Sequence, residues 1–74
     1  MQEYVINVNE VEDLQMVNNI TDLEKMLSKA KSTVIQGGVV ILTRKYADGR
    51  TENFDELTTE ADLEAYKQSV FKYL

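Results

Sequence analysis

The chain has 74 residues, enough for one small domain that buries only about 60% of the surface its unfolded form exposes. It contains no Cys and no His, so it can form no disulfide, and the soft ligands of common structural metal sites are absent. Its net charge of −5, with no dense basic stripe, argues against binding to nucleic-acid phosphates, which requires several Lys and Arg side chains acting together.

The composition is that of a folded chain, with 43% hydrophobic and 28% charged residues and no Pro. No apolar run reaches the roughly 18 residues that a membrane span needs, and the first residues lack the basic and then apolar pattern of a secretory signal. No linker, repeat or low-complexity tract divides the sequence. We therefore expect residues 1–74 to form a single small α+β domain that is cytoplasmic and does not contact a membrane.

The first expected element is a strand over residues 3 to 9. Its apolar residues alternate with its polar ones and share one face: Tyr4, Ile6 and Val8. Residues 10 to 18 allow two interpretations. Asn9 and Glu12 have the spacing of a helix cap, which favours a short helix, but the same residues also suit an irregular linker.

A helix is predicted over residues 20 to 36. Apolar residues recur along it at steps of three and four: Ile20, Leu23, Leu27, Ala30 and Val34. Thr21 and Glu24 have the spacing of a capping box at its start. Gly37 and Gly38 end it, because glycine readily adopts the left-handed conformation that closes a helix.

Two strands follow, over residues 38 to 46 and 51 to 57, and the turn at Asp48 and Gly49 joins them as a hairpin. A tight two-residue turn and a three-residue loop would align different residues across the hairpin. The three-residue loop, with Gly49 left-handed, is preferred because its register is chemically coherent. It places Leu42 opposite Phe54, Arg44 opposite Glu52, and Tyr46 opposite Arg50.

A last helix is predicted over residues 59 to 73, capped by Thr59. Its apolar stripe comprises Leu63, Tyr66, Val70 and Tyr73. The resulting order, β-α-β-β-α, defines an α+β fold with a three-stranded sheet. Right-handed crossover chirality suits the spatial order 1-3-2, with the third strand in the middle and both helices packed on one face. In that order the first strand is an exposed edge.

If residues 10 to 17 are helical, the order becomes β-α-α-β-β-α, which is also the order of KH-type RNA-binding domains. Such domains hold RNA with a GxxG loop between their first two helices. Here that position reads Asn18-Asn19-Ile20-Thr21, without glycine or nearby basic residues. The similarity concerns element order alone and carries no functional residue.

Catalytic chemistry has little support in this sequence. Nucleophilic catalysis usually pairs Ser or Cys with a positioned His, and the chain has neither Cys nor His. The acidic run from Glu10 to Asp13 lacks the alternating Asp/Asn pattern and central Gly of a calcium-binding loop. Gly37 and Gly38 follow a helix and precede a strand, the reverse of a phosphate-binding loop. We expect no enzymatic activity, no cofactor and no metal.

The faces of the strands suggest a different role. If Ile6, Val40 and Leu42 face the helices, a second set of mostly apolar residues lies on the back of the sheet: Val5, Val39, Ile41 and Leu57, beside Asn7. An apolar patch next to an open strand edge indicates association, but β-branched residues also occur in strands for their strand propensity alone. The leading hypothesis is a small non-enzymatic protein-interaction or regulatory module, binding another protein or a second copy through the back of the sheet or the first-strand edge.

Two other hypotheses remain open. Glu10, Glu12 and Asp13 form an acidic cluster that would let the chain mimic nucleic acid toward a DNA- or RNA-binding protein. The third is direct RNA binding, by a KH-like domain or through the basic and aromatic residues of the hairpin. Nearby acids in the hairpin argue against the third.

Overall fold

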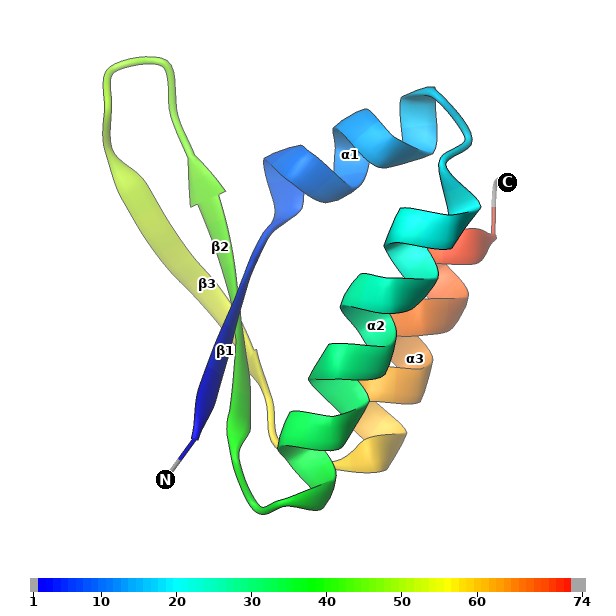
Figure 1. The fold of residues 1–74 in the computed structure, drawn as a ribbon. Coiled ribbons are helices and arrows are strands. Elements are labelled where there is room, and N and C mark those ends of the chain that lie inside the picture. Colours follow the sequence, from blue (N-terminus) through cyan, green and yellow to red (C-terminus); the bar gives the residue numbers. More distant parts are fainter. Residues whose placement is uncertain (1, 73–74) are drawn as a thin grey trace.

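The computed structural model describes residues 2–72, which form three helices and one three-stranded sheet (Figure 1). The elements in chain order are β1 (Glu3–Asn7), α1 (Val8–Met16), α2 (Ile20–Ile35), β2 (Val39–Lys45), β3 (Thr51–Leu57) and α3 (Glu60–Phe71). The predicted α+β class is confirmed. The predicted helix count is wrong for this part of the chain, because α1 is an additional helix.

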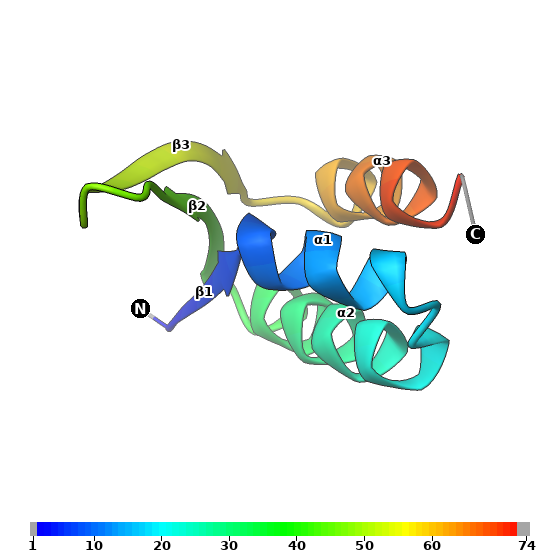
Figure 2. The same ribbon diagram turned by 90° about the horizontal axis from the view of Figure 1, so that it is seen from above.

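The elements form two layers. Figures 1 and 2 show the sheet on one side and α1, α2 and α3 together on the other. No described element covers the other face of the sheet, which is called the open face below.

The strand order is β1-β2-β3, so the predicted order 1-3-2 is wrong. β1 pairs with β2 in parallel, and β2 pairs with β3 in antiparallel orientation. The cause lies at the end of α2, where the Val39 N–H donates to the Gln2 carbonyl over 2.9 Å. This bond brings β2 directly against β1, which leaves no space for β3 between them. β1 remains an edge strand, as expected.

α1 begins inside the segment that was predicted as strand. Asn7 ends β1 and caps the helix, since its side-chain oxygen accepts a hydrogen bond from the Asn9 N–H (2.9 Å). The Asn9 side chain then bonds both backbone groups of Lys45, at 2.9 and 3.1 Å, and ties α1 to the end of β2. Val8 and Val11 are buried on α1. The helical interpretation is therefore confirmed for residues 10 to 16, while residues 17 and 18 form a turn.

The helix–sheet interface contains the core. Its buried members come from every element: Ile6, Val8, Val11, Leu23, Leu27, Ala30, Val34, Val40, Leu42, Leu57, Leu63 and Val70. The predicted stripe of α2 supplies four of them, while Ile20 is exposed. Asn19, and not Thr21, caps this helix by accepting from the Asp22 N–H. Gly37 follows the helix with a positive φ of 84°, as its position predicts.

The hairpin has the predicted loop but a different register beyond it. Gly49 is left-handed, the Tyr46 N–H donates to the Arg50 carbonyl, and Arg44 pairs with Glu52. A β-bulge then shifts the alignment, so that Leu42 pairs with Asp55. The predicted pairing of Leu42 with Phe54 is wrong. Phe54 is 48% exposed instead of packing under the helices.

α3 begins as predicted, with Thr59 accepting a hydrogen bond from the Asp62 N–H (3.1 Å). It packs beside α2 and contributes Leu63 and Val70 to the core. The expected end of the helix at residue 73, and with it Tyr73, lies outside the described residues.

Candidate protein-binding surface

The open face consists of side chains that alternate with those of the core. The strand register places Glu3, Val5 and Asn7 of β1 on it, followed by Val39, Ile41, Thr43 and Lys45 of β2, and by Thr51, Asn53 and Glu56 of β3. Val5 is 54% exposed and Ile41 is partly exposed. Val5 and Ile41 therefore form an apolar part of this face that is accessible to solvent, while Val39 and Thr43 beside them are buried.

The patch predicted on this face is smaller than expected. Leu57 pairs with Val40 and is only 5% exposed within the core, so its predicted place on the back of the sheet is wrong. Val39 has the expected direction but is 9% exposed. Asn7 is partly buried, and its side-chain oxygen is engaged in capping α1. Val5 and Ile41 remain as the accessible apolar residues of the prediction.

Charged residues flank this apolar centre in an ordered way. Glu3 is the β1 neighbour of Val39, and Glu56 is the β3 neighbour of Ile41, so carboxylates lie on both sides of the apolar residues of β2. Both glutamates are exposed. Lys45 lies at the opposite end of β2. The surroundings of Val39 and Ile41 are thus acidic, which favours a basic partner.

The acidic residues of α1 do not form one patch. Both carboxylate oxygens of Glu12 accept hydrogen bonds from Arg44 of β2, at 3.0 and 3.3 Å. This hydrogen-bonded pair raises the pKa of Arg44. Glu10 instead lines a hollow beside Tyr4, and Asp13 is exposed. Glu12 is paired with Arg44, and Glu10 lies in the hollow beside Tyr4. The three acids therefore give weak support to mimicry of nucleic acid.

Tyr66 on α3 provides a prediction for the pH dependence of stability. Burial, together with a smaller effect of the Glu12 carboxylate, raises the pKa of Tyr66 to about 12 from 10.0. The folded state thus holds the phenol proton more tightly than the unfolded state. The stabilisation is complete below pH 10 and is lost as the pH rises toward 12. We expect urea unfolding to show this decrease in the free energy of unfolding.

The Tyr66→Phe variant is the control for this measurement, because it keeps the ring and removes the ionising group. Its free energy of unfolding should fall less between pH 10 and 12 than that of the natural chain. Equal slopes for the two proteins would contradict the raised pKa of Tyr66.

A hollow of about 270 Å³, called the edge groove below, lies beside β1 between α1 and α2. It is lined by Tyr4, Glu10, Leu14, Asp22, Lys25, Met26 and Lys29. The Lys29 ammonium lies 5.6 Å from the centre of the Tyr4 ring. Burial and the nearby Glu10 raise the pKa of Tyr4. The groove thus has apolar and aromatic walls with charges of both signs at its rim.

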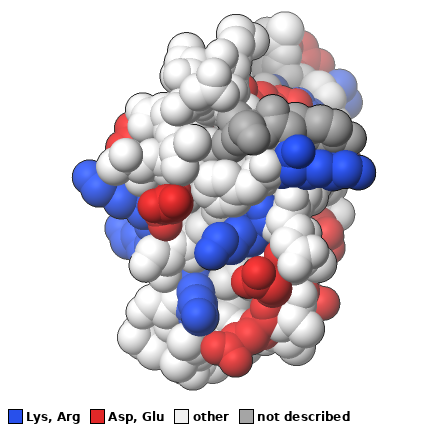
Figure 3. Space-filling model, turned by 90° about the vertical axis from the view of Figure 1, so that its right-hand side faces the viewer, with Lys and Arg blue, Asp and Glu red and all other residues white. Residues whose placement is uncertain are grey.

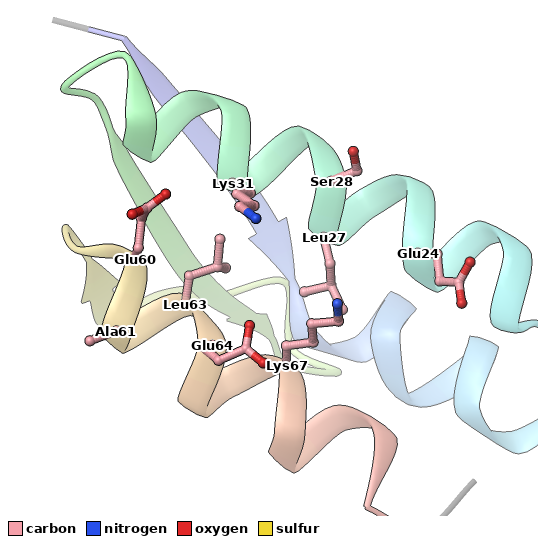
Figure 4. A pocket seen from close by; sticks show the side chains of 9 residues that line it. All are labelled: Glu24, Leu27, Ser28, Lys31, Glu60, Ala61, Leu63, Glu64 and Lys67. Atoms are coloured by element: carbon pink, nitrogen blue, oxygen red, sulfur yellow. The ribbon is translucent and has the colours of Figure 1, made fainter.

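A larger hollow of about 740 Å³ separates α2 from α3. Figure 4 shows Leu27 and Leu63 between the helices, and both belong to the buried core. Its charged residues are Glu24, Lys31, Glu60, Glu64 and Lys67. Figure 3 shows basic and acidic side chains interspersed on this side of the molecule. Such a surface lacks the single-sign field that would select a charged ligand.

Metal, membrane and RNA-binding sites have little support among residues 2–72. No group of three or more Asp or Glu side chains in this range could hold a metal ion. None of the described helices is long and apolar enough to cross a membrane. The element order agrees with that of KH domains, but the connection between α1 and α2 has no glycine or basic residue.

The chain matches no model of a known protein family, no curated protein and no solved structure.

Proposed function

We propose that this chain is a small non-enzymatic protein-interaction module, which binds its partner through the open face of the sheet and the adjoining edge of β1. The observation that carries the proposal is the one-sided packing of the fold. All helices of residues 2–72 cover the same face of the sheet, which leaves Val5 and Ile41 accessible on the other (Figures 1 and 2).

The size of the open face limits what can bind there. Three strands about 4.8 Å apart, with about 3.3 Å per residue, give the face an area of roughly 300 Å². Stable interfaces usually bury about 800 Å² per partner. Two copies stacked face to face would fall short of that value. A partner must therefore extend past the face, and the free edge of β1 adjoins it.

The charges favour a partner with a particular chemistry. The chain carries a net charge of −5, and Glu3 and Glu56 flank the apolar residues of β2. A complementary surface would present an apolar side chain with Lys or Arg on either side of it. Such a complex would form more slowly at high salt, because exposed charges steer association and are screened by ions.

The experiment compares the natural chain with Ile41→Asp as bait in the cells that produce it, using quantitative mass spectrometry. Ser28→Asp, which adds the same charge on the helical side, is the matched control. We expect Ile41→Asp to lose at least about nine tenths of a partner that the control retains, since a desolvated carboxylate at an apolar contact costs several kcal/mol. Circular dichroism checks that both variants fold.

Equal capture by both variants would contradict binding through the open face. Light scattering over a range of concentrations tests the remaining possibility that the partner is a second copy. A dimer that dissociates in Ile41→Asp but persists in Ser28→Asp would assign the face to self-association.

A further inference from the structure

We propose that the free edge of β1 binds an extended segment of another protein as a fourth strand of the sheet, with basic side chains toward the open face and apolar side chains toward the edge groove. This inference rests on the proposed function, and it specifies the conformation and chemistry of the partner.

The backbone of β1 has the geometry that strand addition requires. Gln2 accepts a hydrogen bond from the Val39 N–H, and the parallel register continues from Glu3 opposite Val39 to Asn7 opposite Thr43. Peptide groups alternate in direction along a strand. Those of Glu3 and Val5 consequently point away from β2. Among residues 2–72, no strand pairs with them.

The other edge of the sheet is protected in ways that β1 is not. β3 carries the β-bulge and three acids, Glu52, Asp55 and Glu56. Bulges and charges on an edge strand are known to prevent pairing with another chain. β1 pairs regularly over five residues, and Glu3 is its one charged residue. An incoming strand would therefore meet a regular edge at β1 and an interrupted one at β3.

The edge groove defines where the side chains of the added strand would lie. Alternate side chains of that strand would face the helices, next to Tyr4, Leu14 and Met26. These walls suit an apolar side chain. The side chains between them would face the same side as Glu3 and Val5, where a basic group pairs with Glu3 and its aliphatic stem covers Val5. The matching segment alternates basic and apolar residues.

A second copy fits this edge less well than a single extended segment. Figure 2 shows α2 on the same side of the molecule as the free edge of β1, and α2 lines the edge groove. A second copy paired through its own β1 would bring another α2 into this region. An isolated strand occupies only the space beside β1, between α2 and solvent.

The test uses a synthetic ten-residue peptide of alternating Lys and Val, with both ends blocked, as a probe for the full chain at 150 mM salt. Nuclear magnetic resonance measures the exchange rate of each backbone amide hydrogen. We expect saturating peptide to slow exchange at the Glu3 and Val5 amides by at least about tenfold, because both become hydrogen-bonded. A peptide of the same composition in two blocks, five Lys followed by five Val, should give no such protection.

Two variants link this protection to the edge. Val5→Pro removes the outward N–H without removing a bond of the sheet, and should weaken binding of the alternating peptide at least about tenfold. Val5→Lys keeps the N–H and should weaken binding several-fold by repulsion of the peptide's Lys residues. If Val5→Pro fails to fold, Val5→Lys together with the exchange data still decides the question.

Three outcomes would overturn strand addition: no binding of the alternating peptide at 1 mM, binding without protection of the Glu3 and Val5 amides, or protection of these amides in the chain alone at high concentration, which would assign the edge to a second copy. Loss of partner capture in Ile41→Asp together with unprotected Glu3 and Val5 amides would refute the strand and keep the face as the binding surface. Partner capture that persists in Ile41→Asp, together with protected Glu3 and Val5 amides, would refute binding through the open face and leave strand addition standing.

Discussion

Replacing Leu23 by Ala is expected to leave a large fraction of the chain unfolded at 25 °C. Leu23 on α2 has no exposed surface and lies in the core. Removing such a side chain costs about 2 to 5 kcal/mol, since it loses burial and leaves a cavity. A domain of this size has a net stability of roughly 3 to 5 kcal/mol, so the loss is comparable with the whole. Circular dichroism with a urea titration measures the effect.

The Leu23→Met variant is the control, because it nearly conserves the volume of the side chain. Such exchanges usually cost less than about 1.5 kcal/mol, and this variant should stay folded. Ile20→Ala, on an exposed side chain of the same helix, should change the free energy of unfolding much less than Leu23→Ala. If Leu23→Ala unfolds at the same urea concentration as the natural chain, Leu23 does not lie in the core.

Replacing Gly38 by Ala is expected to destabilise the chain by about 1 to 3 kcal/mol or more, the usual range for overpacking. A Cβ atom at this position would lie 2.5 Å from the Gln2 carbonyl oxygen and 2.8 Å from the Thr33 side chain. The carbonyl is backbone and also accepts the Val39 N–H. Relief of the clash must therefore separate β1 from β2. Urea unfolding gives the difference in free energy.

Gly37→Ala separates this steric effect from the conformational freedom of glycine. Gly37 has a positive φ, but nothing lies within 4 Å of a Cβ added there. Its substitution should cost about 1 kcal/mol, the penalty of a left-handed residue, and thus less than Gly38→Ala. The opposite ranking would contradict the close approach of Gly38 to β1.

The sequence predicts those parts of the fold that depend on local patterns. The α2 stripe, the Gly49 loop and the Thr59 cap each depend on residues a few positions apart, and each is found in the structure. The position of β3 depends on where α2 returns the chain. Right-handed crossover chirality allows β1 and β2 to be neighbours or to be separated by a third strand. The close packing of Gly38 against Gln2 favours neighbouring strands, and it has no local signature in the sequence.

The residues of the open face were predicted in part for the same reason. Alternation correctly places Val5 and Ile41 on the back of the sheet. It fails after Phe54, because one bulge residue reverses the direction of the side chains and moves Leu57 into the core. The apolar residues of β2 and β3 suit either register, so their pattern does not reveal the bulge. The edge groove depends on α1, which the local pattern left open as helix or linker.

The pairing of β1 with β2 also has a consequence for the order of folding. Glu3 and Val39 lie 36 positions apart, whereas β2 and β3 are joined by a short loop. Contacts between distant residues form late, because closing a long loop costs more entropy. We therefore expect β1 to join the sheet last and to detach first. A strand bound to its free edge would hold it in place, so partner and fold would stabilise each other by mass action.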